Sequence, residues 1–327
     1  MAAVSPEKVD LLLYGPSRPI IDNGFSDQFV LHRFQTIAEL EHLGPDIADR
    51  IRGVAITDHT VKGDARTLAR FPRLEMISSF GVGYDHIDAN YAREHQIVVT
   101  NTPDVLTEEV ADLALGLLIA TLREFVQADQ YLRAGLWPKQ NFPLSTGSLR
   151  DRRVGMVGMG RIGQAIARRL EASRVPVVYH SRKPAAGVAH QHYPDLIEMA
   201  KAVDTLVVIT PGGAATAKLI NAEVMQALGP RGVIINVARG SVVDEAALIA
   251  ALRSGTIQAA GLDVFAQEPD VPEELRRMPN VVLLPHIGSA SVVTRNAMNQ
   301  LVVDNLTAWF AGQPPLTPVP ETPVTSR

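Results

Sequence analysis

Residues 158–163 read Gly-Met-Gly-Arg-Ile-Gly, and this short stretch decides the fold. It follows an apolar run at 153–157 and opens an amphipathic segment at 161–172, so the sequence predicts a strand, a tight turn and a helix in succession. Gly158 would allow the tight turn, Gly160 would let the backbone approach a pyrophosphate, and Gly163 would let helix and strand pack closely. The free amides at the start of the helix would face the phosphates, which predicts a dinucleotide site.

The same alternation continues on both sides of the turn. Strands are predicted at 153–157, 175–179, 205–210, 232–237, 261–265 and 281–285, and helices at 161–172, 195–203, 222–228 and 245–253. Such a series is typical of a doubly wound sheet of the Rossmann type. In the first third, strands are predicted at 9–14, 53–57, 74–78 and 97–100, and helices near 46–51 and 65–70. Strand-helix alternation there predicts a second parallel sheet.

Three segments outside these units complete the organisation. Asn101-Thr102-Pro103-Asp104 breaks the pattern and would cap one long helix from about residue 108 to residue 132. The segment 135–150 has no periodicity and carries Trp137, so it is expected to be a functional loop or to cover a partner. A helix at 291–310 would pack back on the first domain, and the proline-rich end from residue 314 would form an extended tail.

The composition narrows the function classes. The chain has 327 residues, enough for two packed domains, and a formal net charge of −4. This charge gives no general attraction to nucleic acid or to an anionic membrane, so neither is an expected partner. The chain has no cysteine, which excludes disulfides and thiolate chemistry. No signal-peptide pattern occurs at the start, and we expect a soluble, cytoplasmic protein.

The strand end that follows the glycine turn predicts which dinucleotide binds. NAD-binding folds usually carry an acid about 20 residues beyond the glycines, where it holds the ribose 2′-hydroxyl. Here no acid occurs from residue 172 to residue 194, and the strand ends in Tyr179-His180-Ser181-Arg182-Lys183. A hydroxyl and two cations suit a 2′-phosphate, with Arg182 as a fork and Lys183 as a point charge. NADPH is therefore the predicted cofactor, and a solvated basic turn is the alternative.

Three residues further along carry the predicted chemistry. Arg239, Glu268 and His286 each follow an apolar run that reads as a strand. Beside a nicotinamide, arginine would clamp the carboxylate of a 2-keto acid and polarise its ketone. His286 would donate the proton to the ketone oxygen, and Glu268 would favour the charged imidazole. Alone, each would more often be a surface or capping residue; together they predict a catalytic site for hydride transfer.

The segments around these residues resemble those of the D-isomer-specific 2-hydroxyacid dehydrogenases. The matching segments are 155–163, 236–240 (Asn-Val-Ala-Arg-Gly), 261–265 (Gly-Leu-Asp-Val-Phe), 285–289 (Pro-His-Ile-Gly-Ser), and 101–103 followed by 110–112. The resemblance implies an α/β fold with two Rossmann-like domains, a flavodoxin-like substrate domain and a dinucleotide-binding domain. It implies a substrate domain from 1–102 that is completed by a C-terminal helix and tail at 289–327. It places the NADP-binding domain, with a dimerisation helix and loop, at 103–288.

Motif and resemblance together give the expected site residues. The cofactor would contact Thr107, Gly158, Gly160, Arg161, Ile162, Gly163, Ser181, Arg182, Lys183, Pro211, Thr216, Val237, Ala238, Asp263, His286 and Gly288, with Asp263 facing the nicotinamide amide. The substrate would contact Phe80, Val82, Gly83, Leu106, Trp137 and Arg239, with backbone amides of 81–83 on its carboxylate. For Phe80 a place in the core is the alternative, because an aromatic residue after a strand is more often a core residue. No metal site is expected, and His190 and His192 are interpreted as surface residues.

Within the family, 180–184 and 136–138 look most like the NADPH-dependent glyoxylate/hydroxypyruvate reductases. Small 2-keto acids are therefore the expected substrates. Hydroxyphenylpyruvate reductases show the same pattern, so substrate size stays open, and a dinucleotide-sensing corepressor of this fold is the alternative of another class. The resemblance also implies a homodimer, in which Trp137 either reaches the partner's active site or only lies in the interface.

Overall fold

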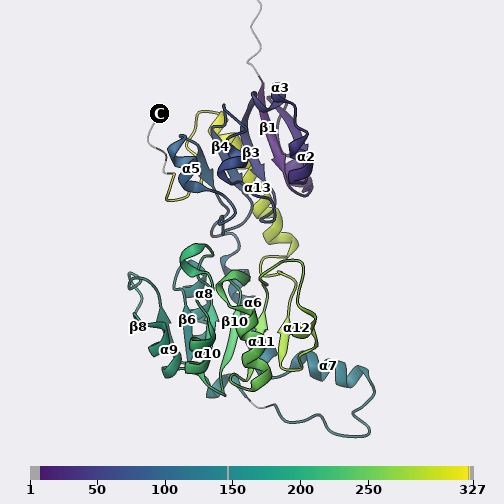
Figure 1. Cartoon of the computed structure of the whole chain (residues 1–327), viewed down its shortest axis with the longest axis vertical. Helices are drawn as coiled ribbons and strands as arrows, with labels where there is room; N and C mark the ends of the chain where they lie inside the picture. Colours follow the sequence, from purple (N-terminus) through teal and green to yellow (C-terminus); the bar gives the residue numbers. More distant parts are fainter. Residues whose placement is uncertain (1–7, 146, 323, 325–327) are drawn as a thin grey trace, which may run out of the picture. The chain divides into compact units, whose positions relative to one another are not determined.

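The computed structural model describes residues 8–145, 147–322 and 324, and the chain forms two compact units (Figure 1). The first unit spans Met1–Leu106 and Ser291–Arg327, and the second spans Thr107–Ala290. The sequence analysis placed these divisions after residues 102 and 288, and the units divide after residues 106 and 290. Each unit is a parallel sheet covered by helices, as the alternation of strands and helices predicted.

The sheet of the first unit has the flavodoxin-like strand order. Its parallel strands are β1 (Val9–Tyr14), β2 (Phe29–Phe34), β3 (Ile51–Ile56), β4 (Met76–Ser79) and β5 (Val98–Thr100), in the order β2-β1-β3-β4-β5. Strand β2 is absent from the sequence prediction because it is an edge strand with a mostly half-exposed, mixed sequence. One of its polar residues, His32, reaches Asp10 on β1 at 2.6 Å. The sheet therefore has one strand more than predicted.

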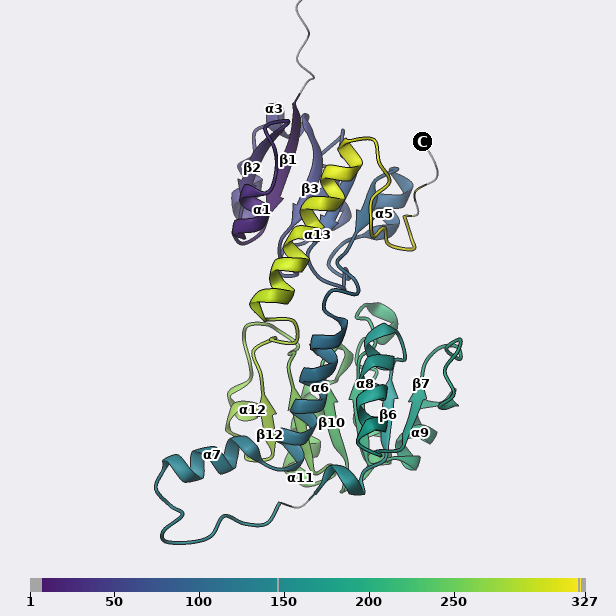
Figure 2. The same ribbon diagram turned by 180° about the vertical axis from the view of Figure 1, so that it is seen from behind.

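Helices cover both faces of this sheet. They are α1 (Pro19–Asn23), α2 (Ile37–Glu41), α3 (Pro45–Ala48), α4 (Ala65–Leu68), α5 (Ala89–Glu94) and α13 (Val292–Phe310). Helix α13 lies against β3 and β4, which confirms that the last helix returns to the first part of the chain (Figure 2). Gly53 permits this approach, because a Cβ there would lie 2.8 Å from the Phe310 ring. The predicted helix at 46–51 is too long at its end, since Ile51 already starts β3.

Up to Thr322, the proline-rich end is paired with the first unit and is not an extended tail. Pro318 forms a β-bridge with Thr100, and the amide of Val319 donates to the carbonyl of Val99. The fully buried Asn305 of α13 holds the start of this segment: its Oδ1 accepts from the amides of Leu316 (2.9 Å) and Thr317 (3.1 Å). Side-chain and backbone pairing together therefore attach the segment 316–322 to the sheet, although composition alone indicates an extended chain.

The second unit is the doubly wound unit that the glycine turn predicted. Its strands are β6 (Val154–Val157), β7 (Val177–His180), β8 (Gln191–Tyr193), β9 (Thr205–Val208), β10 (Val233–Asn236), β11 (Ala259–Leu262) and β12 (Val281–Leu283). They pair in the order β12-β11-β10-β9-β6-β7-β8, all parallel. This is the Rossmann order with one strand added beyond the sixth. The three-residue edge strand β8 was not predicted, because its sequence is short and polar.

The helices of the second unit form two layers. Helices α6 (Thr107–Leu122) and α8 (Arg161–Ala172) contact each other on one face, as Figure 2 shows. Helices α9 (Leu196–Ala202), α10 (Ala222–Leu228) and α11 (Glu245–Ser254) pack on the other face around a shared apolar core. The unit also contains α7 (Phe125–Arg133), α12 (Glu273–Arg277) and the short 3-10 turns Leu149–Asp151, Ala214–Thr216 and Gly240–Val242.

The prediction of one long helix over 108–132 is wrong. Helix α6 ends at Leu122 and α7 begins at Phe125. Between them Glu124 takes a left-handed backbone conformation with φ of 53°. Neither glycine nor proline stands at the break, so the local sequence carries no signal for it. Among the residues that the structure describes, no helix combines the length and the apolar character needed to cross a bilayer.

Asn305→Ala tests the attachment of the C-terminal segment. Because two backbone amides lose a buried acceptor, we expect the free energy of local opening to fall by about 1–3 kcal/mol. Hydrogen exchange of peptides covering 316–322 should then be about tenfold faster or more. Gln300→Ala, on the exposed side of the same helix, is the matched control. If both variants exchange at the same rate, Asn305 does not hold the segment.

Candidate active site

The glycine turn has the geometry that its sequence predicted. Gly158 has a φ of 105°, and a Cβ there would lie 2.9 Å from the carbonyl oxygen of Ile209. A Cβ on Gly163 would lie 2.6 Å from the carbonyl oxygen of Gly158. Gly160, the N-cap of α8, has no atom within 4 Å of its Cβ position. Two glycines therefore close the turn against its neighbours, and the middle one leaves open space at the helix N-terminus.

This turn lies where an open α/β sheet binds ligands. Strands β6 and β9 are neighbours in the sheet, and the strand order reverses between them. The crevice beyond the carboxyl ends of such strands is the usual ligand site. Gly158 follows β6 and Pro211 follows β9. The loop after β9 is compact, because Thr216 Oγ1 donates to the carbonyl oxygen of Pro211 at 2.7 Å.

The loop after β7 carries the residues predicted to select the cofactor. Ser181 Oγ donates to the carbonyl oxygen of Lys183 at 2.6 Å, and the side chains of Arg182 and Lys183 are exposed. The carbonyl oxygen of Ser181 lies 2.9 Å from Nε2 of His192, which is on β8. The sequence analysis interpreted His192 as a surface residue, but here it fixes the position of the loop. Strand β8, which the sequence analysis did not predict, thus helps to hold residues 181–183 in position through His192.

Arg239 lies in a loop that Asn236 shapes. Nδ2 of Asn236 donates to the carbonyl oxygen of Arg239 at 3.0 Å, and its Oδ1 accepts from the amide of Ala238 at 3.1 Å. These bonds turn the chain through Val237 directly after β10. The next residue, Gly240, touches the loop after β11 so closely that a Cβ would lie 1.8 Å from the Phe265 backbone. The loops after β10 and β11 are packed so closely together that only glycine fits at this position.

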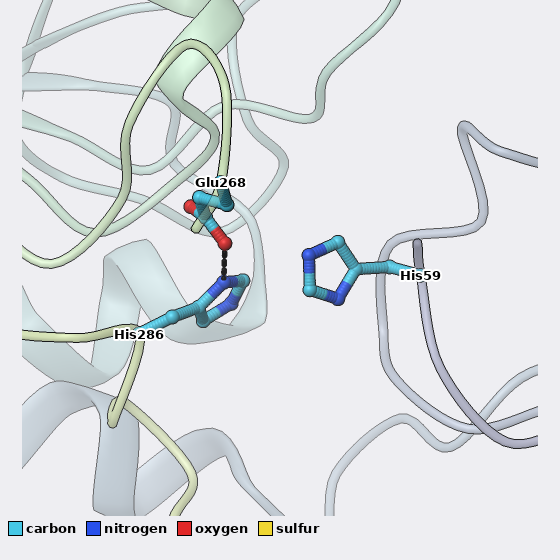
Figure 3. Close-up of side chains that lie close together, drawn as sticks. All are labelled: His59, Glu268 and His286. Atoms are coloured by element: carbon cyan, nitrogen blue, oxygen red, sulfur yellow. Dashed lines mark hydrogen bonds and ion pairs between the residues drawn. The ribbon is translucent and has the colours of Figure 1, made fainter. Parts of the chain in front are cut away.

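The structure pairs the predicted proton donor with its carboxylate. Nδ1 of His286 lies 2.6 Å from Oε2 of Glu268, and Figure 3 shows the imidazole facing this carboxylate. Oε1 of Glu268 accepts from the amide of Phe265 at 3.0 Å, which orients the carboxylate. Because Glu268 engages Nδ1, a proton exchanged with a substrate would pass through the other ring nitrogen, Nε2. The third residue drawn in Figure 3, His59, belongs to the first unit.

Asp263 fixes the loop that carries His286. Its side chain is almost fully buried, and its two carboxylate oxygens accept from the amides of Ile287 (2.7 Å) and Gly288 (2.8 Å). Burial raises the pKa of Asp263, although these two amides and the nearby charge of His286 act in the opposite direction. His286 itself has a φ of 53°, a conformation that non-glycine residues adopt only when their surroundings hold them. The sequence analysis gave Asp263 no such positioning role.

The predicted substrate loop lies in the first unit, after β4. Gly81 has a φ of 126°, and its amide donates to Oγ1 of Thr102 at 2.9 Å. Nδ2 of Asn101 donates to the carbonyl oxygen of Val82 at 2.8 Å. The Asn-Thr-Pro segment therefore holds this loop in shape. Because the amide of Gly81 is already used, only those of Val82 and Gly83 stay candidates for a ligand.

The other predicted residues are divided between the units. Phe80 and Leu106 are buried residues of the first unit, and Thr107 is the first residue of α6 in the second. Trp137 lies in the loop after α7, and 61% of its surface is exposed. Arg161 and Ile162 form the first turn of α8. Arg239, Glu268 and His286 follow three neighbouring strands, β10, β11 and β12, whose carboxyl ends lie at one edge of the sheet.

Chemically, the second unit combines a general acid or base with a cation. An imidazole oriented by a carboxylate can take up and release a proton at a defined ring nitrogen. A guanidinium on a neighbouring strand end can bind a carboxylate or stabilise a developing oxyanion. Next to a dinucleotide turn, this set is typical of hydride transfer between a nicotinamide and a carbonyl or alcohol.

Comparison with known proteins gives the same family. Residues 115–288 match the model of the D-isomer specific 2-hydroxyacid dehydrogenase NAD binding domain. The chain is 53% identical to an NADPH-dependent glyoxylate/hydroxypyruvate reductase from Sinorhizobium meliloti, solved with NADP and malonate; the TM-score is 0.93, covering 98% of this chain and 99% of that one. It is 46% identical to glyoxylate/hydroxypyruvate reductase A of Arabidopsis thaliana and 44% identical to hydroxyphenylpyruvate reductase of Plectranthus scutellarioides, each alignment covering 96% of this chain and 99% of the relative. The chain therefore belongs to the D-isomer-specific 2-hydroxyacid dehydrogenase family.

Proposed function

We propose that the protein is an NADPH-dependent reductase of small 2-keto acids, which converts glyoxylate to glycolate and hydroxypyruvate to D-glycerate. The observation that carries this proposal is the 2.6 Å hydrogen bond between His286 Nδ1 and Glu268 Oε2 in a dinucleotide-binding unit. The relatives from Sinorhizobium meliloti and Arabidopsis thaliana, both named as glyoxylate/hydroxypyruvate reductases, support the choice of substrates. In this proposal the second unit binds the cofactor and the first unit binds the substrate carboxylate.

The residues of the second unit fit NADPH. The space beside Gly160 and the amides in the first turn of α8 would receive the pyrophosphate, and Ser181, Arg182 and Lys183 would bind the 2′-phosphate. The remaining contacts would come from Thr107, Gly158, Arg161, Ile162, Gly163, Pro211, Thr216, Val237, Ala238, Asp263, His286 and Gly288. When bound, NADPH would supply the hydride that reduces the keto carbon.

The residues of the chain would carry out the rest of the reaction. His286 Nε2 would donate a proton to the keto oxygen, while Glu268 holds Nδ1 and stabilises the charged imidazole before the transfer. Arg239 would bind the substrate carboxylate and stabilise negative charge on the keto oxygen. The amides of Val82 and Gly83 would bind the same carboxylate, and Phe80, Leu106 and Trp137 would limit the size of the substrate.

Turnover of a keto-acid panel tests the proposal. We expect the purified protein to oxidise NADPH fastest with glyoxylate and hydroxypyruvate, more slowly with pyruvate and 4-hydroxyphenylpyruvate, and more slowly with NADH throughout. A preference for 4-hydroxyphenylpyruvate would move the function to the activity named for the Plectranthus scutellarioides relative. Cofactor binding without turnover of any keto acid would instead favour a dinucleotide sensor.

His286→Ala should lower kcat by about 10²–10⁴-fold while NADPH still binds, because the proton donor is lost. Glu268→Gln keeps the shape but not the charge, so it should give a smaller loss of kcat. His190→Ala, outside the proposed site, is the control and should behave like the wild type. Steady-state kinetics and a fluorescence titration with NADPH separate the two effects. Wild-type turnover by His286→Ala would exclude this residue as the proton donor.

Arg182→Ala should raise the KM for NADPH by about 10–100-fold, because a charge-assisted hydrogen bond to the 2′-phosphate is lost. The KM for NADH, which has no such phosphate, should stay within about twofold of wild type by the same reasoning. Lys201→Ala, a surface cation on α9, is the control. An equal loss with both cofactors would contradict the 2′-phosphate argument.

We also propose that the enzyme is a homodimer. Exposed apolar side chains gather on α7 and the loop that follows it: Phe125, Val126, Leu132, Leu136, Trp137 and Leu144. Apolar surface of this extent on one segment is typical of a protein interface. Light scattering should therefore give the mass of two chains.

A charge on this surface should separate the dimer. Leu132→Glu is expected to shift the mass toward one chain, because a carboxylate would be buried without a partner. Ile37→Glu, at an exposed apolar position on α2, should leave the mass unchanged. If Trp137 reaches the partner's site, Trp137→Ala should raise the KM for keto acids in the intact dimer; an unchanged KM would leave it an interface residue.

A further inference from the structure

The loop proposed to bind the substrate carboxylate has little conformational preference of its own. Residues 81–83 read Gly-Val-Gly, and Gly81 adopts a φ of 126°. Glycine loses more backbone entropy than other residues when it is fixed in one conformation. Amides that are not oriented before an anion arrives must be ordered at the expense of its affinity. Contacts from outside the loop must therefore hold it in shape.

One such contact comes from the C-terminal segment 316–322. The hydroxyl of Tyr84, which directly follows the Gly-Val-Gly sequence, donates to Oε2 of Glu321 at 2.9 Å. Burial and then the bond to Glu321 raise the pKa of Tyr84 to about 12, so the hydroxyl stays protonated and remains a donor at neutral pH. The Tyr84 side chain also packs against the apolar cluster that contains the buried Val319. This end of the loop is thus bound to the C-terminal segment.

A second contact runs through Asn101. Its Nδ2 donates to the carbonyl oxygen of Val82 at 2.8 Å. Thr317 fixes the backbone of Asn101 twice: its carbonyl oxygen accepts from the Asn101 amide at 3.3 Å, and its Oγ1 donates to the Asn101 carbonyl oxygen at 2.6 Å. The same Oγ1 accepts from Nδ2 of Asn305 on α13 at 2.9 Å. All of these residues belong to the first unit, so the connection is internal to it.

We propose that Thr317 and Glu321 are positioning residues of the substrate site. They hold the loop 81–84 so that its amides keep the orientation that binds a carboxylate. This inference rests on the proposed function, because it assumes that the amides of Val82 and Gly83 bind the substrate. Neither positioning residue needs to touch the substrate, since the effect of each passes through the loop.

Tyr84→Phe tests the role of Glu321, because it removes one hydroxyl and keeps the ring. The KM for glyoxylate should rise by about 3–30-fold, as expected when a hydrogen bond to a charged group is lost. The dissociation constant of NADPH, measured by fluorescence titration, should stay within about twofold of wild type, because the cofactor binds to the second unit in the proposed function. Glu321→Gln keeps an oxygen that can accept from Tyr84, so it should change the KM less than Glu321→Ala.

Thr317→Val tests the other connection and should also raise the KM, whereas Thr317→Ser keeps the hydroxyl and should not. Tyr91→Phe is the matched control, since Tyr91 on α5 packs against the same apolar cluster, and its KM should equal that of the wild type. A merely structural role would lower the amount of folded enzyme, and with it the apparent kcat, but not raise the KM. An unchanged KM for Tyr84→Phe would overturn the role of Glu321, and an unchanged KM for Thr317→Val would overturn that of Thr317.

Binding of oxamate gives a readout besides turnover. Oxamate is an analogue of pyruvate whose amide carbonyl does not accept a hydride, so calorimetric titration of the NADPH complex measures carboxylate binding alone. Its dissociation constant should rise in Tyr84→Phe and Thr317→Val by the same factor as the KM, and equal binding by both variants and the wild type would contradict the proposal. A wild type that binds oxamate but reduces no keto acid would reject the proposed function, and the titration would still test the positioning residues. A wild type that does neither would reject both.

Discussion

The buried carboxylate of Asp263 is the constraint on which the active-site geometry of the second unit depends. It accepts the amides of Ile287 and Gly288 and so fixes the turn in which His286 adopts a left-handed backbone conformation. The imidazole then meets Glu268, which a backbone amide holds in place. An ionised group with so little exposure is costly unless hydrogen bonds compensate it, and here the compensating donors belong to the loop that must be ordered. The same two hydrogen bonds therefore stabilise the fold and orient the proposed proton donor.

Parallel strands explain why the remaining groups lie close to this pair. The carboxyl ends of β10, β11 and β12 are neighbours, so the residues that follow them reach one edge of the sheet. Gly240 allows the loops after β10 and β11 to pack against each other, since any side chain there would overlap the Phe265 backbone. At the other end of the sheet, β8 supports the loop of Ser181 through His192. The groups proposed for catalysis and for cofactor selection therefore lie on opposite halves of the sheet, with the glycine turn between them.

The sequence predicted the parts of the structure that have a strong local signal. The glycine turn, the alternating buried strands and the strand-end position of Arg239, Glu268 and His286 could all be derived before any coordinates. Strands β2 and β8 could not, because edge strands with polar or very short sequences lack the apolar pattern. The break at Glu124 has no glycine or proline to mark it. The pairing of Tyr84 with Glu321 joins segments far apart in the chain, which no local pattern encodes.

The way in which the C-terminal segment completes the first unit has a consequence for biosynthesis. Strand β5 receives its outer partner from residues near Pro318, and α13 covers one face of β3 and β4. A ribosome makes these residues only after it has made the whole second unit. Until then the nascent first unit exposes an apolar sheet face and an unpaired strand edge, features that favour aggregation. The second unit, which is continuous in sequence, can therefore fold first, while the N-terminal sheet is completed only when its last helix has been made.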